Sequence, residues 1–193
     1  LMKLEPTASD ADVAELQVRL RSHSVDQARL EALTTGATQP VFPSALAASH
    51  PELVRQAQTR FNVRRRRHAG EVRRQKQAVA QRKQEITEIN TRIRGSQANL
   101  KLVNEQIRIS DELLKDSLTN RFQHLDLLKE SRKLLGSIET DKASLQRAKL
   151  ALSEAGAELD NIKNAFDEDN QTALDETRLN RAELAARVKK FEA

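Results

Sequence analysis

The chain contains no cysteine, tryptophan or tyrosine, and aromatic residues make up only 3% of its 193 residues. The missing cysteines exclude disulfide bonds and thiolate metal sites, although they do not separate a cytoplasmic from a periplasmic location. Few aromatics together with 32% charged residues suit a long helical assembly better than a compact globular core. No stretch approaches the roughly 20 apolar residues that span a bilayer, and no signal-peptide pattern begins the chain.

Apolar residues recur every seven positions in two long runs. A strict seven-residue repeat keeps an apolar seam against a partner helix in a left-handed supercoil. Folding the chain back at Thr119 pairs the two runs from the inside outward, so the sequence predicts an antiparallel coiled-coil hairpin. The first run is Val72, Val79, Ile86, Ile93, Leu100, Ile107 and Leu114, and the second is Ile138, Leu145, Leu152, Leu159 and Phe166.

Charge is distributed unevenly along the same two runs. Residues 60–94 hold twelve arginines and lysines against three glutamates, a net charge of +9. The window that folding places opposite, residues 144–178, holds eight acids against four bases, a net charge of −4. Opposite charges beside an apolar seam commonly set partner and orientation in coiled coils. The charge pattern therefore supports the antiparallel arrangement independently of the apolar repeat.

Capping and breaking residues divide the rest of the chain. Ser9 with Asp12 fits a capping box, and Gly36 fits a C-terminal helix stop. Pro40 and Pro43 force extended backbone around them. The predicted organisation is a short helix over 9–35, an extended linker over 36–50, an ascending helix over 51–116, a tip over 117–120 and a descending helix over 121–193.

The two long helices match each other in length, at roughly 100 and 110 Å for a rise of 1.5 Å per residue. The short helix then belongs at the end of the hairpin away from the tip, and the linker is long enough to return the chain to that end. We expect an all-α fold, a long antiparallel two-helix coiled-coil hairpin with a shorter N-terminal helix packed near its open end. Both chain ends then lie at the same base.

A second line of seam positions is partly polar. Polar seam residues cost stability and fix the register of the two helices. We expect these side chains to lie at the contact between the helices. They are Gln75, Arg82, Ser96 and Ser110.

Residue types that carry catalysis or bind metals form no recognisable site. The four histidines are scattered without ligand-like spacing. The acidic run 167–169 lacks the glycine and the glutamate that a calcium loop needs at its sixth and twelfth positions. The chain has no glycine-rich phosphate loop and no nucleophile elbow. We therefore expect no enzymatic activity, no metal and no cofactor.

The four consecutive arginines at 64–67 are the one sharp basic signal. Nucleic-acid binding needs such charge on an exposed face, usually with stacking aromatic side chains, and only Phe61 lies nearby. Four consecutive residues also point to all sides of a helix. A basic coiled-coil arm that binds nucleic acid and a purely structural coiled coil remain the alternative functions.

The predicted tip is the other candidate site. Leucines stand where the seam has no partner left, a threonine and an asparagine can cap the descending helix, and an arginine offers a charged donor. An apolar end with a polar rim is typical of a docking surface, whereas a helical turn closed by its own leucines is the alternative. The candidate partner-binding residues are Leu114, Leu118, Thr119, Asn120 and Arg121.

The order of these segments resembles a known family. Its parts are residues 28–33 (Ala-Arg-Leu-Glu-Ala-Leu) followed by Gly36, residues 41–46 (Val-Phe-Pro-Ser-Ala-Leu), and a long hairpin with Leu-Thr-Asn-Arg at 118–121. They resemble the helical domain of membrane fusion proteins, the periplasmic adaptors of bacterial type I secretion systems (HlyD-type). Residues 4–7 look like the exit from the lipoyl-like domain of that family, which places residues 1–8 before the helical domain.

The resemblance implies a periplasmic segment of an inner-membrane-anchored protein, with the anchor outside this chain. Such adaptors partner an inner-membrane ABC transporter and copies of themselves in a ring, implied to be a hexamer. They meet a trimeric outer-membrane channel through their tips, so that a secreted protein substrate leaves the cell. Nucleic acid is not a partner in this interpretation.

Carried over to this chain, the tip contact falls on Leu114, Leu118, Thr119 and Arg121. Related adaptors also carry an arginine at a set offset before the tip leucine. Here no arginine stands four residues before Leu113 or Leu114, and Arg108 is only nearby. The residue that takes the arginine's role is therefore unassigned.

Overall fold

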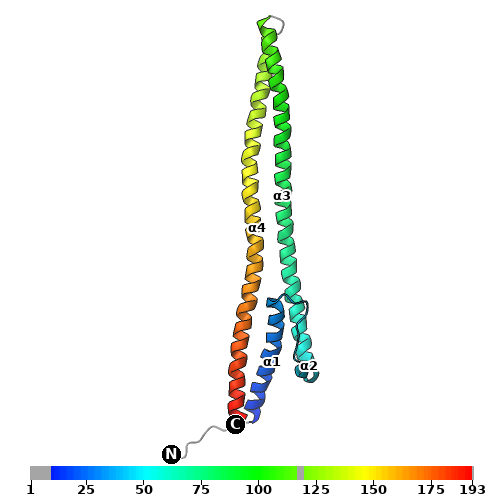
Figure 1. The fold of residues 1–193 in the computed structure, drawn as a ribbon, viewed down its shortest axis with the longest axis vertical. Coiled ribbons are helices and arrows are strands. Elements are labelled where there is room, and N and C mark those ends of the chain that lie inside the picture. The colour runs from blue at the N-terminus through cyan, green and yellow to red at the C-terminus, as the bar shows by residue number, and fades with distance from the viewer. Residues whose placement is uncertain (1–9, 117–119, 193) are drawn as a thin grey trace, which may run out of the picture. The chain divides into compact units, whose positions relative to one another are not determined.

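The computed structural model describes residues 10–116 and 120–192, and almost all of them are helical (Figure 1). No β-strand occurs in these ranges. The predicted fold, an all-α hairpin of two long helices with a shorter N-terminal helix, is therefore confirmed. Residues 1–8, which the sequence assigns to the exit from a preceding domain, lie outside the described residues. The helices are α1 (Asp10–Thr34), α2 (Ser44–Ser49), α3 (Pro51–Lys115) and α4 (Arg121–Glu192).

The chain divides into two compact units. Unit 1 contains α1, α2, α3 up to Arg73 and α4 from Asp160 onward. Unit 2 contains α3 from Arg74 and α4 up to Leu159. Within each unit α3 and α4 run antiparallel.

Helix α1 ends in a Schellman motif. The amide of Ala37 donates to the carbonyl of Ala32 at 2.9 Å, and the amide of Gly36 donates to that of Leu33 at 3.3 Å. This geometry needs a left-handed residue after the helix, and Gly36 supplies it with φ of 68°. The glycine stop predicted from the sequence is therefore present, and it satisfies two carbonyls that the end of α1 would leave unpaired.

The segment between α1 and α3 differs from the extended linker that the sequence predicts. Residues 44–49 form the short helix α2, which begins directly after Pro43. The amide of Ala47 donates to the carbonyl of Pro43 at 3.0 Å, and the amide of His50 to that of Leu46 at 2.9 Å. Proline has no amide to contribute, and none is needed at a helix start. Pro43 therefore stands directly before a short helix. The expectation of extended backbone is wrong for residues 44–49.

The core of unit 1 is built by three helices. Leu30 and Leu33 of α1 pack with Phe61 of α3 and Leu174 of α4 in one buried cluster. Phe61 is fully buried and Leu174 is 2% exposed. Asp26 of α1 lies 3.5 Å from a guanidinium nitrogen of Arg60 on α3 at the edge of this cluster. Unit 1 is thus a three-helix bundle, as the packing of the short helix on the hairpin predicts.

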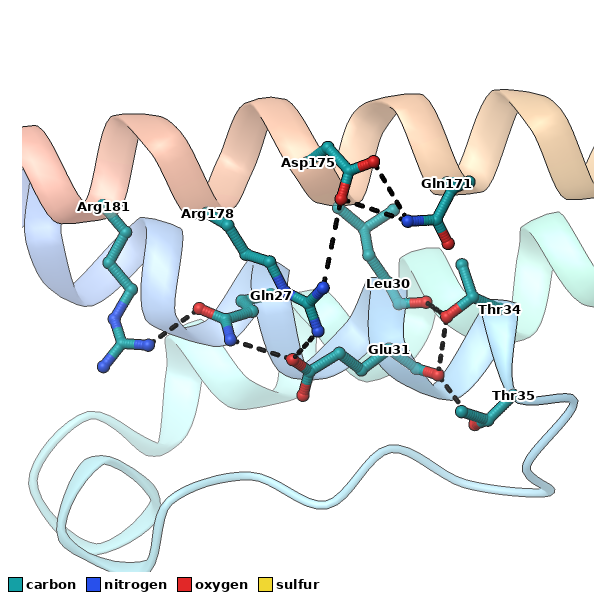
Figure 2. A network of polar contacts seen from close by, with 9 residues as sticks. All are labelled: Gln27, Leu30, Glu31, Thr34, Thr35, Gln171, Asp175, Arg178 and Arg181. Carbon is teal, nitrogen blue, oxygen red and sulfur yellow. Dashed lines mark hydrogen bonds and ion pairs between the residues drawn. The ribbon is translucent and has the colours of Figure 1, made fainter.

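Polar side chains join α1 to α4 beside this core, as Figure 2 shows. Gln27 Nε2 and Arg178 Nη2 donate to the same oxygen, Glu31 Oε1, at 2.8 and 2.9 Å. Arg181 Nη1 donates to Gln27 Oε1 at 2.8 Å. The hydrogen bond from Gln27, followed by that from Arg178, holds the pKa of Glu31 below its ordinary value. The network fixes the register of α1 on α4, because each helix contributes two of its four members.

Unit 2 is held by the predicted apolar seam. Ile89 and Ile93 of α3 are buried with Ala148 of α4, and the half-buried Ile86 and Leu145 pack against them. Ile93 and Leu145 form one of the pairs expected from folding at residue 119. The seven-residue repeat therefore predicts the contact between α3 and α4 correctly here.

The polar residues predicted at the seam differ in their environments. Gln75 Nε2 donates to the carbonyl of Ala155 at 2.8 Å, so this side chain crosses the seam. Ser96 is half-buried. Arg82 is exposed and pairs with Glu85 of its own helix at 3.0 Å, so its predicted seam position is wrong. A long charged side chain at the edge of a seam can extend its charged group into water, which costs less free energy than burying the charge.

The opposite charges of the two runs meet across α3 and α4 at two points in the described ranges. In unit 1 Arg64 Nη2 lies 3.4 Å from Asp169 Oδ2. In unit 2 Arg92 donates from Nη2 and Nε to Asp141 Oδ1 at 2.8 and 3.1 Å, although Asp141 precedes the acidic window. Many other charged side chains pair with neighbours three or four residues away, as Arg67 does at 3.2 Å. The net charges of the windows therefore overstate how many pairs join the helices.

Candidate docking surface at the hairpin tip

The structure describes three of the five predicted tip residues. Leu114 belongs to the last turn of α3, Asn120 precedes α4, and Arg121 is its first residue. Leu118 and Thr119 lie outside the described residues. The geometry of the tip therefore rests on the two helix ends that flank residues 117–119.

Asn120 caps the N-terminus of α4. Its side-chain Oδ1 accepts a hydrogen bond from the amide of Phe122 at 2.9 Å. Its carbonyl accepts from the amides of Gln123 and His124 at 3.1 and 3.4 Å. An asparagine at this position satisfies an amide that the first turn leaves unpaired. Asn120 therefore has a structural task, and its side-chain oxygen is already engaged.

The end of α3 presents one leucine more openly than the other. Leu114 is half-buried, as the seven-residue repeat predicts, whereas Leu113 is 38% exposed. Lys115 Nζ lies 3.2 Å from Asp111 Oδ2 in the same turn. The more exposed leucine at this helix end is thus Leu113, which the family pattern allows in place of Leu114 but which is not among the predicted contact residues.

Polar contacts tie the two helices together next to the tip. His124 Nδ1 and Ser110 Oγ lie 3.2 Å apart across the pair, and Ser110 is 8% exposed. Further along, Ser131 Oγ donates to Asn104 Oδ1 at 3.0 Å. Ser110 is therefore a buried seam residue, as predicted, and its hydroxyl has a partner from α4. These contacts hold the two helix ends in place for the exposed side chains that they carry.

Several exposed apolar side chains near the tip were missed by the reasoning from sequence. Phe122 is 76% exposed, Ile109 is 45% exposed and Leu125 is 42% exposed. The available signal was an apolar residue that falls outside the seven-residue repeat, since such a residue cannot enter the seam. With Leu113, these side chains give both helix ends an apolar character on surfaces that the pair does not bury.

The two arginines near the tip, Arg108 and Arg121, differ in their ion pairs. Arg108 donates to Glu105 Oε1 at 2.7 Å and to Glu112 Oε1 at 2.9 Å. The hydrogen bond from Arg108 lowers the pKa of Glu105, and the same bond raises that of Arg108. Arg121 is exposed and has no ion pair with any residue in 10–116 or 120–192. Arg121 is therefore the arginine at this end that is free to meet a partner.

Other chemistry is absent from the parts of the chain that the structure describes. None of its helices is both long and apolar enough to cross a membrane. No group of three or more histidine or acidic side chains is placed to hold a metal ion in those same residues.

Together, the seam and the cap at Asn120 define a class of protein, the antiparallel α-helical hairpin. The chain belongs to the family described as AprE, long alpha-helical hairpin, which matches residues 9–192. It is also similar to the crystal structure of the soluble domain of LipC, a membrane fusion protein of a type I secretion system. That similarity has a TM-score of 0.88 and 18% sequence identity, and covers 100% of this chain and 93% of that chain.

A comparison with curated proteins finds no match. The resemblance drawn from the sequence, to the helical domain of membrane fusion proteins, is confirmed by the family match and the similar fold. Neither the family nor the matched structure is described as an enzyme.

Proposed function

We propose that the chain is the periplasmic hairpin of an adaptor, a membrane fusion protein of a bacterial type I secretion system. The observation that carries the proposal is membership of the AprE hairpin family over residues 9–192. The similarity in fold to LipC, itself a membrane fusion protein, supports it. The adaptor links an inner-membrane ABC transporter to a trimeric outer-membrane channel, and a secreted protein substrate passes through the assembly.

The tip is the proposed contact with the outer-membrane channel. Exposed Leu113 and Phe122 stand at the two helix ends that flank it, and Arg121 supplies a charge that has no ion pair within residues 10–116 and 120–192. Burying a large apolar side chain at an interface stabilises it by about 1.5–3 kcal/mol, and an arginine adds a directional donor. Leu118 and Thr119 remain predicted members of this contact, as do Leu114 and Asn120.

The remaining features of an adaptor belong to the same proposal. The hairpin lies in the periplasm, the parent protein is anchored in the inner membrane, and copies assemble side by side in a ring, a hexamer. No catalytic group, metal or cofactor takes part in this task.

The nucleic-acid alternative is weakened by the surroundings of the four arginines. Arg64 contacts Asp169, Arg65 donates to the carbonyl of Thr38, and Arg67 pairs with Glu71. Three members of the run thus already have a partner within the chain, and four consecutive residues point to different sides of α3, so only part of the run can face a phosphate backbone. The family match likewise favours the adaptor over this alternative and over a purely structural coiled coil.

The test is in-cell photo-crosslinking with the probe at position 122 of the parent protein in its native host. We expect capture of an outer-membrane channel protein, because Phe122 is exposed beside the tip. The matched control is Leu150, which is 65% exposed on the same helix about 40 Å away at 1.5 Å per residue. Channel capture from 150 and not from 122 would sink the proposal, as would capture of nucleic acid by a probe at Arg66.

A further inference from the structure

A second surface of interest lies in unit 1, where α1, α3 and α4 enclose a groove of about 650 Å³. Four arginines line it: Arg29 from α1 and Arg60, Arg64 and Arg67 from α3. The groove opens to solvent on one side of the three-helix bundle. Arg64 and Arg67 belong to the four-arginine run at 64–67, which has no role in the docking proposed for the tip.

The floor of the groove is apolar. We use this term for its apolar lining, the half-buried Ile162 and Phe166 of α4 and the exposed Val63 of α3. The ring of Phe166 stacks on His68 with a centroid separation of 3.8 Å and an interplanar angle of 15°. The stacked rings form an aromatic surface in the groove. An apolar side chain placed against this surface would be removed from contact with water.

Arg64 is held at this wall with donors to spare. Its guanidinium carbon lies 5.6 Å from the centre of the Phe166 ring, and Nη2 reaches Asp169 Oδ2 at 3.4 Å. Its Nε–H is buried and has no hydrogen-bond partner among the described residues. The side chain as a whole is 41% exposed, so an incoming oxygen acceptor would reach the guanidinium through its outer N–H groups.

The acids around the groove do not saturate the arginines. Asp26 Oδ1 lies 3.1 Å from Arg29 Nε and 3.5 Å from Arg60 Nη2. Asp169 contacts Arg64 through one nitrogen only, and Glu71 contacts Arg67 on an open surface where ion pairs are weak. Each guanidinium carries five N–H donors in a planar fork. Most of these donors therefore remain available to carboxylates from another molecule.

We propose that this groove binds an acidic peptide segment of a partner protein, with one apolar side chain on the Phe166 floor and carboxylates on Arg60, Arg64 and Arg67. The juxtaposition of fork-shaped donors with an apolar floor favours this occupant. Planar carboxylates match guanidinium forks in two-point contacts. Inorganic phosphate would leave the floor empty.

The dimensions agree with a short extended peptide. The lining residues of α3 run from Thr59 to Glu71, a span of about 18 Å at the helical rise. An extended chain covers that distance with about five or six residues at 3.3 Å each. The groove lies in unit 1 and the tip in unit 2, so this inference goes beyond the adaptor proposal and can fail without affecting it.

The test titrates a fluorescein-labelled, acetylated pentapeptide of leucine flanked by two acids on each side, Glu-Asp-Leu-Asp-Glu, with the 193-residue chain. Fluorescence anisotropy reports the affinity. We expect saturable binding that weakens about tenfold in Arg64→Ala and in Arg60→Ala. Replacing the peptide's leucine by glycine should weaken binding about tenfold, since the apolar floor then loses its occupant.

Arg66→Ala is the matched control, because this arginine belongs to the same run but does not line the groove and donates to the carbonyl of Asn62. The affinity of the Arg66→Ala variant for the peptide should change less than twofold. Circular dichroism of each variant checks that the helices persist. Arg64→Lys, which keeps the charge and loses the fork, should still weaken binding several-fold.

Three results would overturn the proposal. The first is no saturable binding, and the second is an equal loss in Arg66→Ala, which would mean diffuse attraction. The third is a stronger affinity for inorganic phosphate or for an oligothymidylate of the same charge than for the peptide. In each case the groove would not be a peptide site, and the photo-crosslinking outcome at the tip would be unaffected.

Discussion

At the scale of single residues, two phenylalanines of this chain have opposite environments. Phe61 is fully buried among leucines of α1 and α4, whereas Phe122 is 76% exposed at the start of α4. Residue type alone predicts the same burial for both. Their positions relative to the helix contacts decide that one stabilises the bundle and the other is available to a partner.

Replacing each of them by alanine separates these roles. Phe61→Ala should lower the free energy of unfolding by about 3–4 kcal/mol, because it leaves a cavity in the three-helix core. Phe122→Ala should change it by less than about 0.5 kcal/mol, since its ring is exposed. Urea denaturation followed by circular dichroism measures both. Equal losses would contradict the assigned environments.

Glu31 makes the stability of unit 1 depend on pH. The hydrogen bond from Gln27, and after it that from Arg178, lowers the pKa of Glu31 in the folded chain. A carboxyl with a depressed folded pKa contributes stability above its unfolded pKa, and this contribution is lost as pH falls through the folded pKa.

Comparison of the chain with Glu31→Gln tests this linkage. Over about pH 5 to pH 3 the unmodified chain should lose more stability than the variant, because the variant has no proton to bind at this position. At neutral pH the variant should be the less stable of the two. Thermal melts at several pH values give the comparison, and parallel pH profiles would show that the contacts with Gln27 and Arg178 do not lower the pKa of Glu31 in solution.

At the scale of secondary-structure elements, glycines have position-dependent effects. Gly36 ends α1 with φ of 68°, a conformation that other residues adopt at a cost. Gly95 lies inside α3, where an added Cβ would meet no atom within 4 Å. One glycine is required by the turn, and the other only weakens a helix.

Alanine at the two glycines should therefore have opposite effects. Gly36→Ala should destabilise the chain by about 1 kcal/mol, because Cβ crowds the left-handed backbone. Gly95→Ala should stabilise it by about 0.5–1 kcal/mol, because alanine loses less backbone entropy in a helix. Chemical denaturation detects both signs. A destabilised Gly95→Ala would mean that this position of α3 is not a regular helix interior.

At the scale of the whole molecule, the two units differ in how they bury their side chains. Unit 1 has a core from three helices that includes Leu30, Phe61 and Leu174. Unit 2 relies on a two-helix seam with a smaller buried cluster around Ile89 and Ile93. A seam that is one or two side chains deep removes less apolar area from water per residue.

Amide hydrogen exchange should reflect this difference. In α3, amides around Phe61 should exchange more slowly than those between Ser96 and Val103, because local opening follows the density of buried contacts. Mass spectrometry of peptides from exchanged protein gives both rates in one sample. Faster exchange around Phe61 would contradict a three-helix core.

The contact proposed for the tip can be tested in the assembled secretion system. Phe122→Ala in the parent protein should lower secretion of the substrate several-fold while leaving the protein folded, because it removes apolar area at the proposed channel contact. Leu150→Ala, an exposed position of the same helix, should leave secretion unchanged. Secreted substrate is measured in the medium and normalised to adaptor abundance. Equal secretion in all three strains would contradict a contact through Phe122.

The amino-acid sequence by itself determined the helical hairpin, its seam and the stop at Gly36. These features depend on local periodicity and backbone preference, so Ile93 and Leu145 meet in the seam as the repeat predicts. The tip residues chosen from the sequence include Leu114 and do not include Phe122, which the structure shows to be exposed. A repeat identifies the residues that enter a seam more readily than those left outside it.

Only the tertiary structure decided which polar and charged side chains meet. The pairing of Arg92 with Asp141 and that of Arg178 with Glu31 depend on neighbours distant in sequence. The groove beside Phe166 likewise exists only because α1, α3 and α4 bring arginines and an apolar floor together. Such contacts result from long-range packing, in which a shift of one residue changes the partner of a charged side chain. Local sequence patterns carry no record of that choice.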